Sequence, residues 1–202
     1  MSNGTIVYID GFNLYHALDD LREPALKWVN LWSLSEKLLR PDDSLVAVKY
    51  FTAYATWRPD SYRRHQRYVA ALEACGVSPV IGRFKAKTVR CHSCKKSYDT
   101  HEEKETDVNI GVHMMADLLT GRLDRALIVS ADTDLNAAVL LARAEAPAKQ
   151  IDQVAPPGRK NRNSAALFEI TKGKVRASLL PETIERSVGR IIQRPAEYDP
   201  PK

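Results

Sequence analysis

Short apolar, β-branched runs alternate along this chain with longer segments whose apolar residues recur at helical spacing. The apolar runs predict buried strands at residues 5–9, 44–54, 77–84, 126–129 and 149–155. The segments between them predict helices at residues 13–21, 31–39, 61–74, 107–119 and 135–144, with one more short helix around residues 163–167. A polar stretch, residues 85–105, interrupts this alternation. Strands that alternate with helices predict an α/β fold with a mostly parallel sheet.

The composition is typical of a folded protein that needs neither a membrane anchor nor a disulfide framework. Hydrophobic residues make up 44% and charged residues 27% of the 202 residues, close to the averages of globular domains. No run of about 18 apolar residues is present, so we expect no membrane-spanning helix. No basic residue precedes the apolar run at residues 5–9, so we expect no secretory signal. Three cysteines, an odd number, do not form a disulfide framework. We therefore expect a cytoplasmic protein.

The basic residues are clustered, and the clusters indicate contact with nucleic acid. The chain has 30 Lys and Arg against 25 Asp and Glu, a formal net charge of +5. The cations gather at residues 57–68, where aromatic residues are interleaved with them, at 83–104 and at 159–176. Cations neutralise phosphates and aromatic rings stack on unpaired bases, so we expect single-stranded or looped RNA as the partner. Residues 57–68 fit equally well a solvated helix whose Tyr62 and Tyr68 pack inward. The candidate RNA-binding residues are Arg58, Arg63, Arg64, Lys85, Arg159 and Lys160.

Four aspartates stand where the predicted strands and helices would bring them together. Asp10 ends the first strand, Asp132 and Asp134 follow the fourth, and Asp107 opens the helix that leads into the fourth. Ligands of parallel sheets bind beyond the carboxyl ends of the strands, where the strand order reverses. Several carboxylates at one place repel one another, and a hard divalent cation such as Mg²⁺ or Mn²⁺ removes that repulsion. One or two such ions, about 4 Å apart, activate water for phosphodiester cleavage. Each aspartate taken singly fits a turn or a helix cap as well.

Three short motifs resemble, in order and spacing, those of NYN-domain proteins. They stand at residues 9–14 (IDGFNL), 103–108 (EKETDV) and 129–135 (VSADTDL), and residues 156–158 (PPG) and 178–181 (SLLP) extend the resemblance over nearly the whole chain. NYN-domain proteins are PIN-like nucleases, and this sequence resembles their bacterial LabA-like branch. The resemblance implies a PIN-like three-layer α/β sandwich, with helices on both faces of a mostly parallel five-stranded sheet of order 3-2-1-4-5. It also implies a metal-dependent endoribonuclease.

The resemblance assigns roles to single residues as well. It implies acidic ligands of Mg²⁺ or Mn²⁺ at Asp10, Asp107, Asp132 and Asp134, and residues that orient ligands or substrate at Asn13 and Ser130. It implies a nuclease domain over residues 1–180, and a C-terminal extension with a Pro-rich tail over residues 181–202. Two positions depart from the family pattern: Ala131 stands where Gly is usual, and His113 where many relatives carry a further Asp. Because a positive φ would strain alanine, we expect an ordinary backbone at Ala131.

The polar stretch at residues 85–105 contains Cys91 and Cys94, spaced as half of a zinc site. Structural zinc takes four ligands. His92 and His101 are the local candidates to complete the set, and a second copy of the chain could supply a matching cysteine pair in a homodimer. The alternative is a hairpin tip that keeps a degenerate zinc ribbon. Cys75 is expected in the core.

Three other functions are alternatives to the nuclease: an RNA-binding module, a phosphatase and a dinucleotide-binding enzyme. An RNA-binding regulatory module with weak or no catalysis, acting on the same fold, stays open, and the sequence does not identify a regulatory protein partner. A phosphatase of the haloacid dehalogenase type needs a second acid two residues after Asp10, where this chain has Phe12. A Rossmann dinucleotide enzyme needs a Gly-x-Gly-x-x-Gly motif after the first strand, and none follows here.

Overall fold

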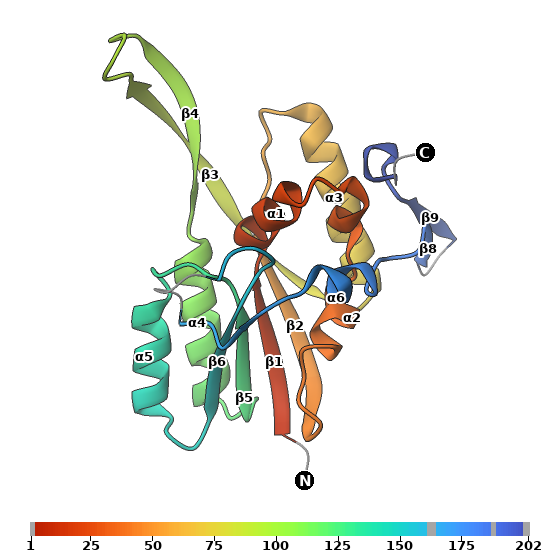
Figure 1. The fold of residues 1–202 in the computed structure, drawn as a ribbon, viewed down its shortest axis with the longest axis vertical. Helices are drawn as coiled ribbons and strands as arrows, with labels where there is room; N and C mark the ends of the chain where they lie inside the picture. The colour runs from red at the N-terminus through yellow and green to blue at the C-terminus, as the bar shows by residue number, and fades with distance from the viewer. Residues whose placement is uncertain (1–2, 161–164, 187–188, 200–202) are drawn as a thin grey trace.

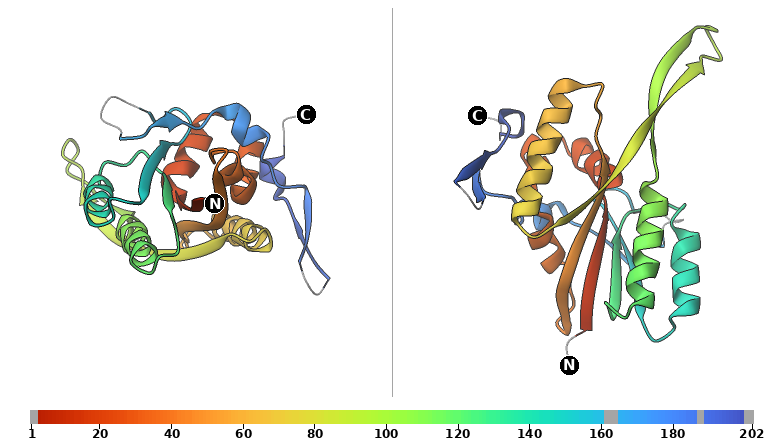
Figure 2. Two further views of the ribbon diagram at one scale, coloured as in Figure 1. Left: turned by 90° about the horizontal axis from the view of Figure 1, so that it is seen from below. Right: turned by 180° about the vertical axis from the view of Figure 1, so that it is seen from behind.

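Seven strands form one mixed sheet that carries helices on both faces (Figures 1 and 2). The computed structural model describes residues 3–160, 165–186 and 189–199. The strands lie in the order β4-β3-β2-β1-β5-β6-β7. Their bounds are β1 Asn3–Asp10, β2 Asp43–Ala53, β3 Ser78–Arg90, β4 Ser97–Lys104, β5 Arg125–Val129, β6 Gln150–Ala155 and β7 Phe168–Glu169. A separate hairpin pairs β8 Thr183–Arg186 with β9 Arg190–Gln193.

The helices divide between the two faces of the sheet. One face is covered by α1 Gly11–Asp20, α2 Leu31–Glu36, α3 Pro59–Ala74 and α6 Lys172–Arg176, with the short 3₁₀ helices η1 Pro24–Trp28 and η2 Ala196–Tyr198 nearby. The other face carries α4 Thr106–Leu119 and α5 Asn136–Glu145. Alternate residues of β1 serve the two cores: Val7 packs in the first apolar cluster and Tyr8 in the second. The alternation of side chains along a strand therefore builds a three-layer sandwich.

The predicted α/β sandwich is confirmed, but the predicted sheet of five mostly parallel strands is wrong. Five parallel strands, β3-β2-β1-β5-β6, do lie in the expected order 3-2-1-4-5. β4 adds to one edge antiparallel to β3, and β7 adds to the other edge parallel to β6. The apolar pattern missed β4 because no core covers it, so its residues stay polar and mostly exposed. β7 was missed because it has two residues.

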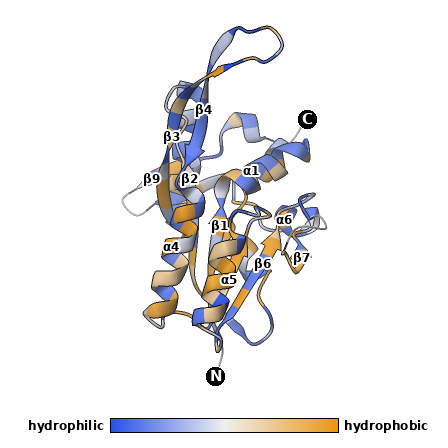
Figure 3. Ribbon diagram, turned by 90° about the vertical axis from the view of Figure 1, so that its left-hand side faces the viewer, coloured by the Kyte–Doolittle hydropathy of each residue, from blue (hydrophilic) through white to orange (hydrophobic). Residues whose placement is uncertain are grey.

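The β3–β4 arm, residues 83–104, extends well beyond the body of the molecule (Figure 1). Its strands pair over eight positions, from Arg83 with Lys104 to Arg90 with Ser97. Figure 3 shows that the arm is mostly hydrophilic. The polar stretch seen in the sequence is therefore a two-stranded projection that leaves from the edge of the sheet.

The end of the chain folds back onto the face that carries α3. Trp28 donates a hydrogen bond from Nε1 to the Pro181 carbonyl (2.8 Å). Ile184 of β8 is buried, and the Tyr198 ring lies 6.5 Å from that of Trp28. Of the short helix predicted around residues 163–167, residues 163–164 lie outside the described part and residues 165–167 are not helical. The neighbouring helix α6 was not predicted.

A buried ion-pair network joins three strands at the opposite end of the sheet from their carboxyl ends. Arg125, with 1% of its side chain exposed, pairs with Asp43 at the start of β2 and with Asp152 of β6 (2.8 Å). Arg40 also pairs with Asp152 (2.8 Å). The Oδ1 atom of Asp43 is buried and has no hydrogen-bond partner in the described part of the chain. This network ties β2, β5 and β6 together.

Candidate functional site

Asp10, Asp107 and Asp132 lie in one region, near the carboxyl ends of β1 and β5. Asp10 is the last residue of β1, and its carboxylate accepts a hydrogen bond from the Asn13 backbone N–H (2.9 Å), which caps α1. β5 pairs with β1 up to Val129, one residue before Ser130. Asp107 lies in the first turn of α4. These three aspartates form the acid cluster, and their charges act on one another in the pKa values described below.

Ser130 and Asn13 form hydrogen bonds that connect the residues of the acid cluster. The Ser130 hydroxyl donates to Oδ2 of Asp10 (2.9 Å) and accepts from the backbone N–H of Asp132 (3.1 Å). Asn13 accepts at Oδ1 from the backbone N–H of Ala131 (3.1 Å). The two polar side chains therefore hold the β5 end against the start of α1.

Asp134 is the most exposed of the four predicted aspartates, and its charge is among those that raise the pKa of Asp107. Its side chain is exposed, and its backbone N–H donates to Oδ1 of Asp132 (3.0 Å). Ala131 has an ordinary backbone: in the described part, the non-glycine residues with positive φ are Arg22, Lys95 and Glu105. The expectation for Ala131 is confirmed.

The electrostatics of the acid cluster are unfavourable without a cation. Burial is the main cause that raises the pKa of Asp10 from 3.8 to about 6, and the charges of Asp107 and Asp132 act in the same direction. The pKa of Asp107 also rises to about 6, first through burial and then through neighbouring carboxylates, chiefly Asp132. Since like charges disfavour ionisation, a bound cation would relieve both residues.

The donors of the acid cluster fit a hard divalent cation in an open site. They are carboxylate oxygens, which Mg²⁺ and Mn²⁺ prefer. Within residues 3–160, 165–186 and 189–199, no three His, Cys, Asp or Glu side chains lie close enough together to hold an ion between them. Mg²⁺ usually keeps several waters and takes one or two carboxylates. One or two of Asp10, Asp107 and Asp132, together with water, would therefore hold the ion.

Two residues of this site, Gln153 and Glu103, were not predicted from the sequence. Gln153 of β6 is buried and donates from Nε2 to the carbonyls of Ser130 (3.0 Å) and Asp132 (3.3 Å). The only signal in the sequence is an amide in an otherwise apolar strand end. Glu103 accepts a hydrogen bond from the Thr106 hydroxyl and adds its charge to those that raise the pKa of Asp107. Its place in the motif at residues 103–108 was the available signal.

His113, which replaces an acid of many relatives, lies outside the acid cluster. Its ring meets the Phe51 ring edge-on at 5.5 Å. Burial lowers its pKa, and the charge of Lys49 acts in the same direction.

Half of the predicted RNA-binding cations are engaged in ion pairs. The pairs are Arg63 with Asp60, Arg64 with Glu197 (3.1 Å) and Arg159 with Asp20 (2.6 Å). Lys160 donates from Nζ to the Leu167 carbonyl (2.8 Å). Arg58 and Lys85 are exposed, and neither forms an ion pair with any residue that the structure describes.

Tyr62 and Tyr68 both pack against the body of the protein, as the alternative interpretation of residues 57–68 predicts. Tyr68 is buried, and its hydroxyl donates to the Val29 carbonyl (2.8 Å). Tyr62 meets the Tyr54 ring at 5.3 Å. The cations of this segment are thus carried by a helix that is itself anchored in the core.

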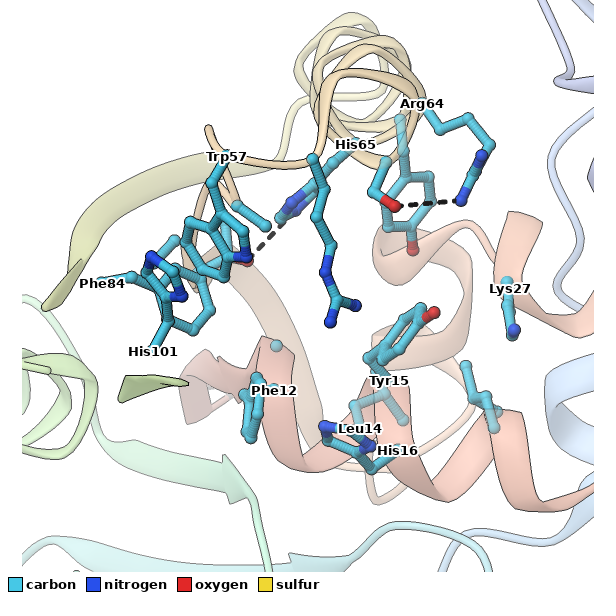
Figure 4. Close-up of a pocket in the computed structure, with 18 of the residues that line it drawn as sticks. Phe12, Leu14, Tyr15, His16, Lys27, Trp57, Arg64, His65, Phe84 and His101 are labelled. Atoms are coloured by element: carbon cyan, nitrogen blue, oxygen red, sulfur yellow. Dashed lines mark hydrogen bonds between the residues drawn. The ribbon is translucent and has the colours of Figure 1, made fainter. Parts of the chain in front are cut away.

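A cavity of about 610 Å³ opens between α1 and α3 (Figure 4). Gly11 and Phe12, which directly follow Asp10, line it. Further rings that line it come from α1, from the loop before α3 and from the base of the β3–β4 arm, and include Tyr15, His16, Trp57, Phe84 and His101. Tyr50, His65, Tyr68 and Tyr198 line it as well. Neither this cavity nor its proximity to Asp10 was predicted.

The cysteine pair lies at the tip of the β3–β4 arm, and the predicted zinc site is not supported. Cys91 and Cys94 are free thiols, and hydrogen bonds from the backbone of Cys94 and Ser93 lower the pKa of Cys91. His101 was a wrong candidate, because its ring is stacked on Trp57 at the base of the arm (3.5 Å between centroids). Cys75 is partly buried against the core, and burial raises its pKa.

None of the helices in the described part of the chain combines the length and the hydrophobicity that crossing a membrane requires.

Comparisons with known proteins give one family and two informative relatives. The NYN domain family model matches residues 4–165. The chain is 27% identical, over 224 aligned residues, to 6-hydroxy-3-succinoylpyridine 3-monooxygenase HspA of Pseudomonas putida, covering 89% of this chain and 71% of that protein. It resembles the crystal structure of VPA0982, a protein of unknown function from Vibrio parahaemolyticus, with a TM-score of 0.57 and 16% identity over 89% of this chain and 97% of that one. The last likeness concerns the fold alone.

Proposed function

Because this chain belongs to the NYN domain family, which is generally nuclease-like, we propose that it is a metal-dependent endoribonuclease that hydrolyses RNA phosphodiester bonds at the acid cluster. The observation that carries this proposal is the placement of the three aspartates, with Asp10 at the end of β1, Asp132 just beyond β5 and Asp107 in the first turn of α4, where their charges act on one another. Acids in mutual repulsion at such a place are typical of a site that binds a cation for catalysis. The nuclease domain in this proposal spans residues 1–180.

The side chains of the acid cluster have distinct tasks in this reaction. One or two of Asp10, Asp107 and Asp132 would hold Mg²⁺ or Mn²⁺, which when bound activates water and stabilises charge on the phosphate oxygens. Ser130 sets the position of Asp10 relative to the backbone of Asp132 through its two hydrogen bonds. Gln153 fixes the same backbone from β6. These contacts keep the carboxylates in place before substrate arrives, which is how a preorganised site lowers a barrier.

Cations near the acid cluster would hold the RNA backbone. Arg58 and Lys85 are exposed and form no ion pair within the described residues, so their charges can meet phosphates. RNA affinity should fall with salt by about 0.7 log unit per log unit of salt for each phosphate contact. A flat salt dependence would remove this part of the proposal.

The decisive experiment compares the wild type with Asp132→Asn on single-stranded RNA and DNA oligonucleotides, in Mg²⁺, Mn²⁺ or EDTA. We expect cleavage of RNA by the wild type only with a metal, and a fall of about 10²- to 10³-fold in Asp132→Asn. RNA binding in EDTA should persist or tighten, because one negative charge near the phosphate is removed. Asp42→Asn, an exposed aspartate at the other end of the sheet, is the matched control and should cleave normally.

Two results would overturn the proposal. Equal cleavage by Asp132→Asn and the wild type would place the activity elsewhere or in a contaminant. A wild type that binds RNA but cleaves it with neither metal would favour the RNA-binding regulatory module.

A second candidate function follows from the name of the Pseudomonas putida relative, which is a monooxygenase of a hydroxypyridine. The observation that favours it is the aromatic cavity, which would suit a flat heteroaromatic acid. Its test is incubation with 6-hydroxy-3-succinoylpyridine, dioxygen and NADH. Because position 3 of the substrate carries the succinoyl group, oxygenation there breaks the bond between the ring and that group. A dihydroxypyridine that has lost the succinoyl chain and gained one oxygen atom from dioxygen, detected by mass spectrometry, would support it.

A further inference from the structure

We propose that the aromatic cavity beside Asp10 binds one unpaired nucleobase of the RNA, next to the phosphodiester that the acid cluster cleaves. This inference rests on the proposed function and names the part of the substrate that the cavity takes. The cavity volume of about 610 Å³ lies within the range of about 300–1,000 Å³ typical of sites for small organic groups. A base within a duplex is hidden by its partner and its neighbours, so a cavity that surrounds a base can take only an unstacked one.

The rings of the cavity are arranged to contact a flat group. Trp57 and Phe84 meet edge-to-face at 4.9 Å, and Phe84 and Phe12 at 6.3 Å. Phe12 is 46% exposed and Trp57 37% exposed. Large rings that gather and yet remain accessible mark a binding surface rather than a core.

A heteroaromatic ring already lies on Trp57 within the molecule itself. The His101 imidazole is stacked on the indole with 3.5 Å between centroids and 6° between planes. This is the arrangement in which aromatic side chains hold bases of single-stranded nucleic acids. Because His101 belongs to β4, Phe84 to β3 and Trp57 to the loop before α3, the base of the β3–β4 arm forms one wall of the cavity (Figure 4).

The charges around the cavity suit a nucleotide within a chain. Arg58 lines the cavity and has no ion-pair partner among the described residues, so it can meet a phosphate. His65 contacts Thr52 through Nε2 (3.1 Å), and burial lowers its pKa to about 4, so this part of the wall is neutral near pH 7. The neutral His65 side of the cavity can contact an uncharged base. Arg58 can contact a phosphate of the RNA backbone.

The surroundings of the cavity favour RNA over a free small molecule. Asp10, Gly11 and Phe12 are consecutive, so the cavity and the acid cluster share one strand end. On the other side, Lys85 follows Phe84 along the exposed arm and has no ion-pair partner in the described ranges. A chain of phosphates that spans from the arm to the acid cluster would use both features, whereas a free heteroaromatic acid would use neither.

The test is a double-mutant cycle between Phe12 and the bases of an RNA probe. Fluorescein-labelled hexauridine and its fully abasic ribose-phosphate counterpart are titrated, in EDTA, with the wild type and with Phe12→Leu, which keeps an apolar side chain but has no ring. We expect about tenfold weaker binding of hexauridine by Phe12→Leu. We expect no change for the abasic probe. Tyr98→Leu, which changes an exposed ring of the arm outside the cavity, is the matched control and should bind both probes as the wild type does.

Variants of Trp57 and a measurement of tryptophan fluorescence distinguish a loss of base binding from a folding defect. Trp57→Leu should likewise weaken the binding of hexauridine and leave the binding of the abasic probe unchanged. Hexauridine should quench the tryptophan fluorescence of the wild type more than that of Trp57→Phe, because the variant lacks the indole of the cavity. Circular dichroism melting curves check that each variant is folded.

The outcomes separate this inference from the proposed function. If Phe12→Leu and Trp57→Leu bind both probes as the wild type does while RNA is still cleaved, the cavity does not take a base and the nuclease stands. If base-dependent binding is found but no metal supports cleavage, the inference holds and the nuclease fails. If hexauridine does not bind while 6-hydroxy-3-succinoylpyridine quenches Trp57, the cavity belongs to a small molecule and the inference is overturned.

Discussion

Asp10 serves two purposes with one carboxylate. One oxygen caps α1 through the Asn13 N–H, and the other accepts from the Ser130 hydroxyl. Both hydrogen bonds favour the ionised form, yet burial raises its pKa to about 6. The cost of an ionised Asp10 is therefore built into the folded state, and it is largest when no cation is present.

The acid cluster should make the stability of the metal-free protein fall as the pH rises. The pKa values of Asp10 and Asp107 lie near 6 in the folded state, against 3.8 for an ordinary aspartate. Between about pH 4 and pH 6 the folded state binds more protons than the unfolded state, so the free energy of unfolding decreases through that window. Mg²⁺ binds the folded state and should raise the melting temperature more at pH 8 than at pH 5. Melting curves at both pH values, with and without Mg²⁺, measure this.

Asp107→Asn measures how much Asp107 contributes to this pH dependence of stability. It should flatten the pH dependence and shrink the Mg²⁺ response, while Asp42→Asn leaves both unchanged. A Mg²⁺ response equal at pH 5 and pH 8 would contradict the assigned electrostatics.

The positions of the aspartates could be predicted from the sequence, whereas the residues that contact them could not. Asp10 and Asp132 end strands, and strand ends are visible as the limits of apolar runs. Gln153 and Glu103 act through tertiary contacts that no periodicity records. The cavity was missed for the same reason, since Phe12, Trp57 and His101 come from separate segments that meet only in the folded chain.

At the scale of elements, the β3–β4 arm is the part that can be removed with least harm to the fold. Replacing residues 87–100 by Asn-Gly joins Ala86 to His101, which are cross-strand partners, by a two-residue turn suited to a hairpin. The His101 stack on Trp57 is kept. Because the deleted residues are mostly exposed, the melting temperature should change little. The salt dependence of RNA binding should weaken by about 0.7 log unit for each lost phosphate contact.

Titrations of hexauridine at several salt concentrations, on the full chain and the shortened one, measure this change. An unaltered slope would show that the deleted cations, Lys87, Arg90, Lys95 and Lys96, do not touch RNA.

The central strands could be predicted from the apolar runs, and their order from the family resemblance, whereas the arm could not be predicted. Buried parallel strands carry continuous apolar runs, and such runs marked β1, β2, β5 and β6. A two-stranded projection has no buried face, so its strands resemble loops in composition. The residues of β4 are charged or polar at nearly every position, and only pairing with β3 reveals the strand.

At the scale of the whole molecule, the Arg125 network should matter more for stability than for catalysis. Arg125→Met leaves Asp43 and Asp152 without their buried partner. Breaking a buried ion pair in this way costs about 3–5 kcal/mol. Urea unfolding should show that loss, and cleavage by the folded fraction should persist because the network lies at the other end of the sheet. Arg122→Met, at an exposed arginine that pairs with Asp117 (3.4 Å), is the control and should cost about 1 kcal/mol or less.

Adding Asp43→Asn to Arg125→Met should restore part of the stability, since one buried charge is then neutral. A full loss of folding in both variants, or no loss in either, would contradict the role given to the network.

The two edges of the seven-stranded sheet differ in length but share a consequence for handling the protein at high concentration. An unpaired edge strand is a template on which further chains add and aggregate, and natural proteins counter this with very short or charged edge strands. β7 has two residues, and β4 carries Asp99, Glu102, Glu103 and Lys104. Neither edge therefore offers a long apolar template. We expect the chain to resist association through its sheet, so that any dimer it forms would be joined by other surfaces.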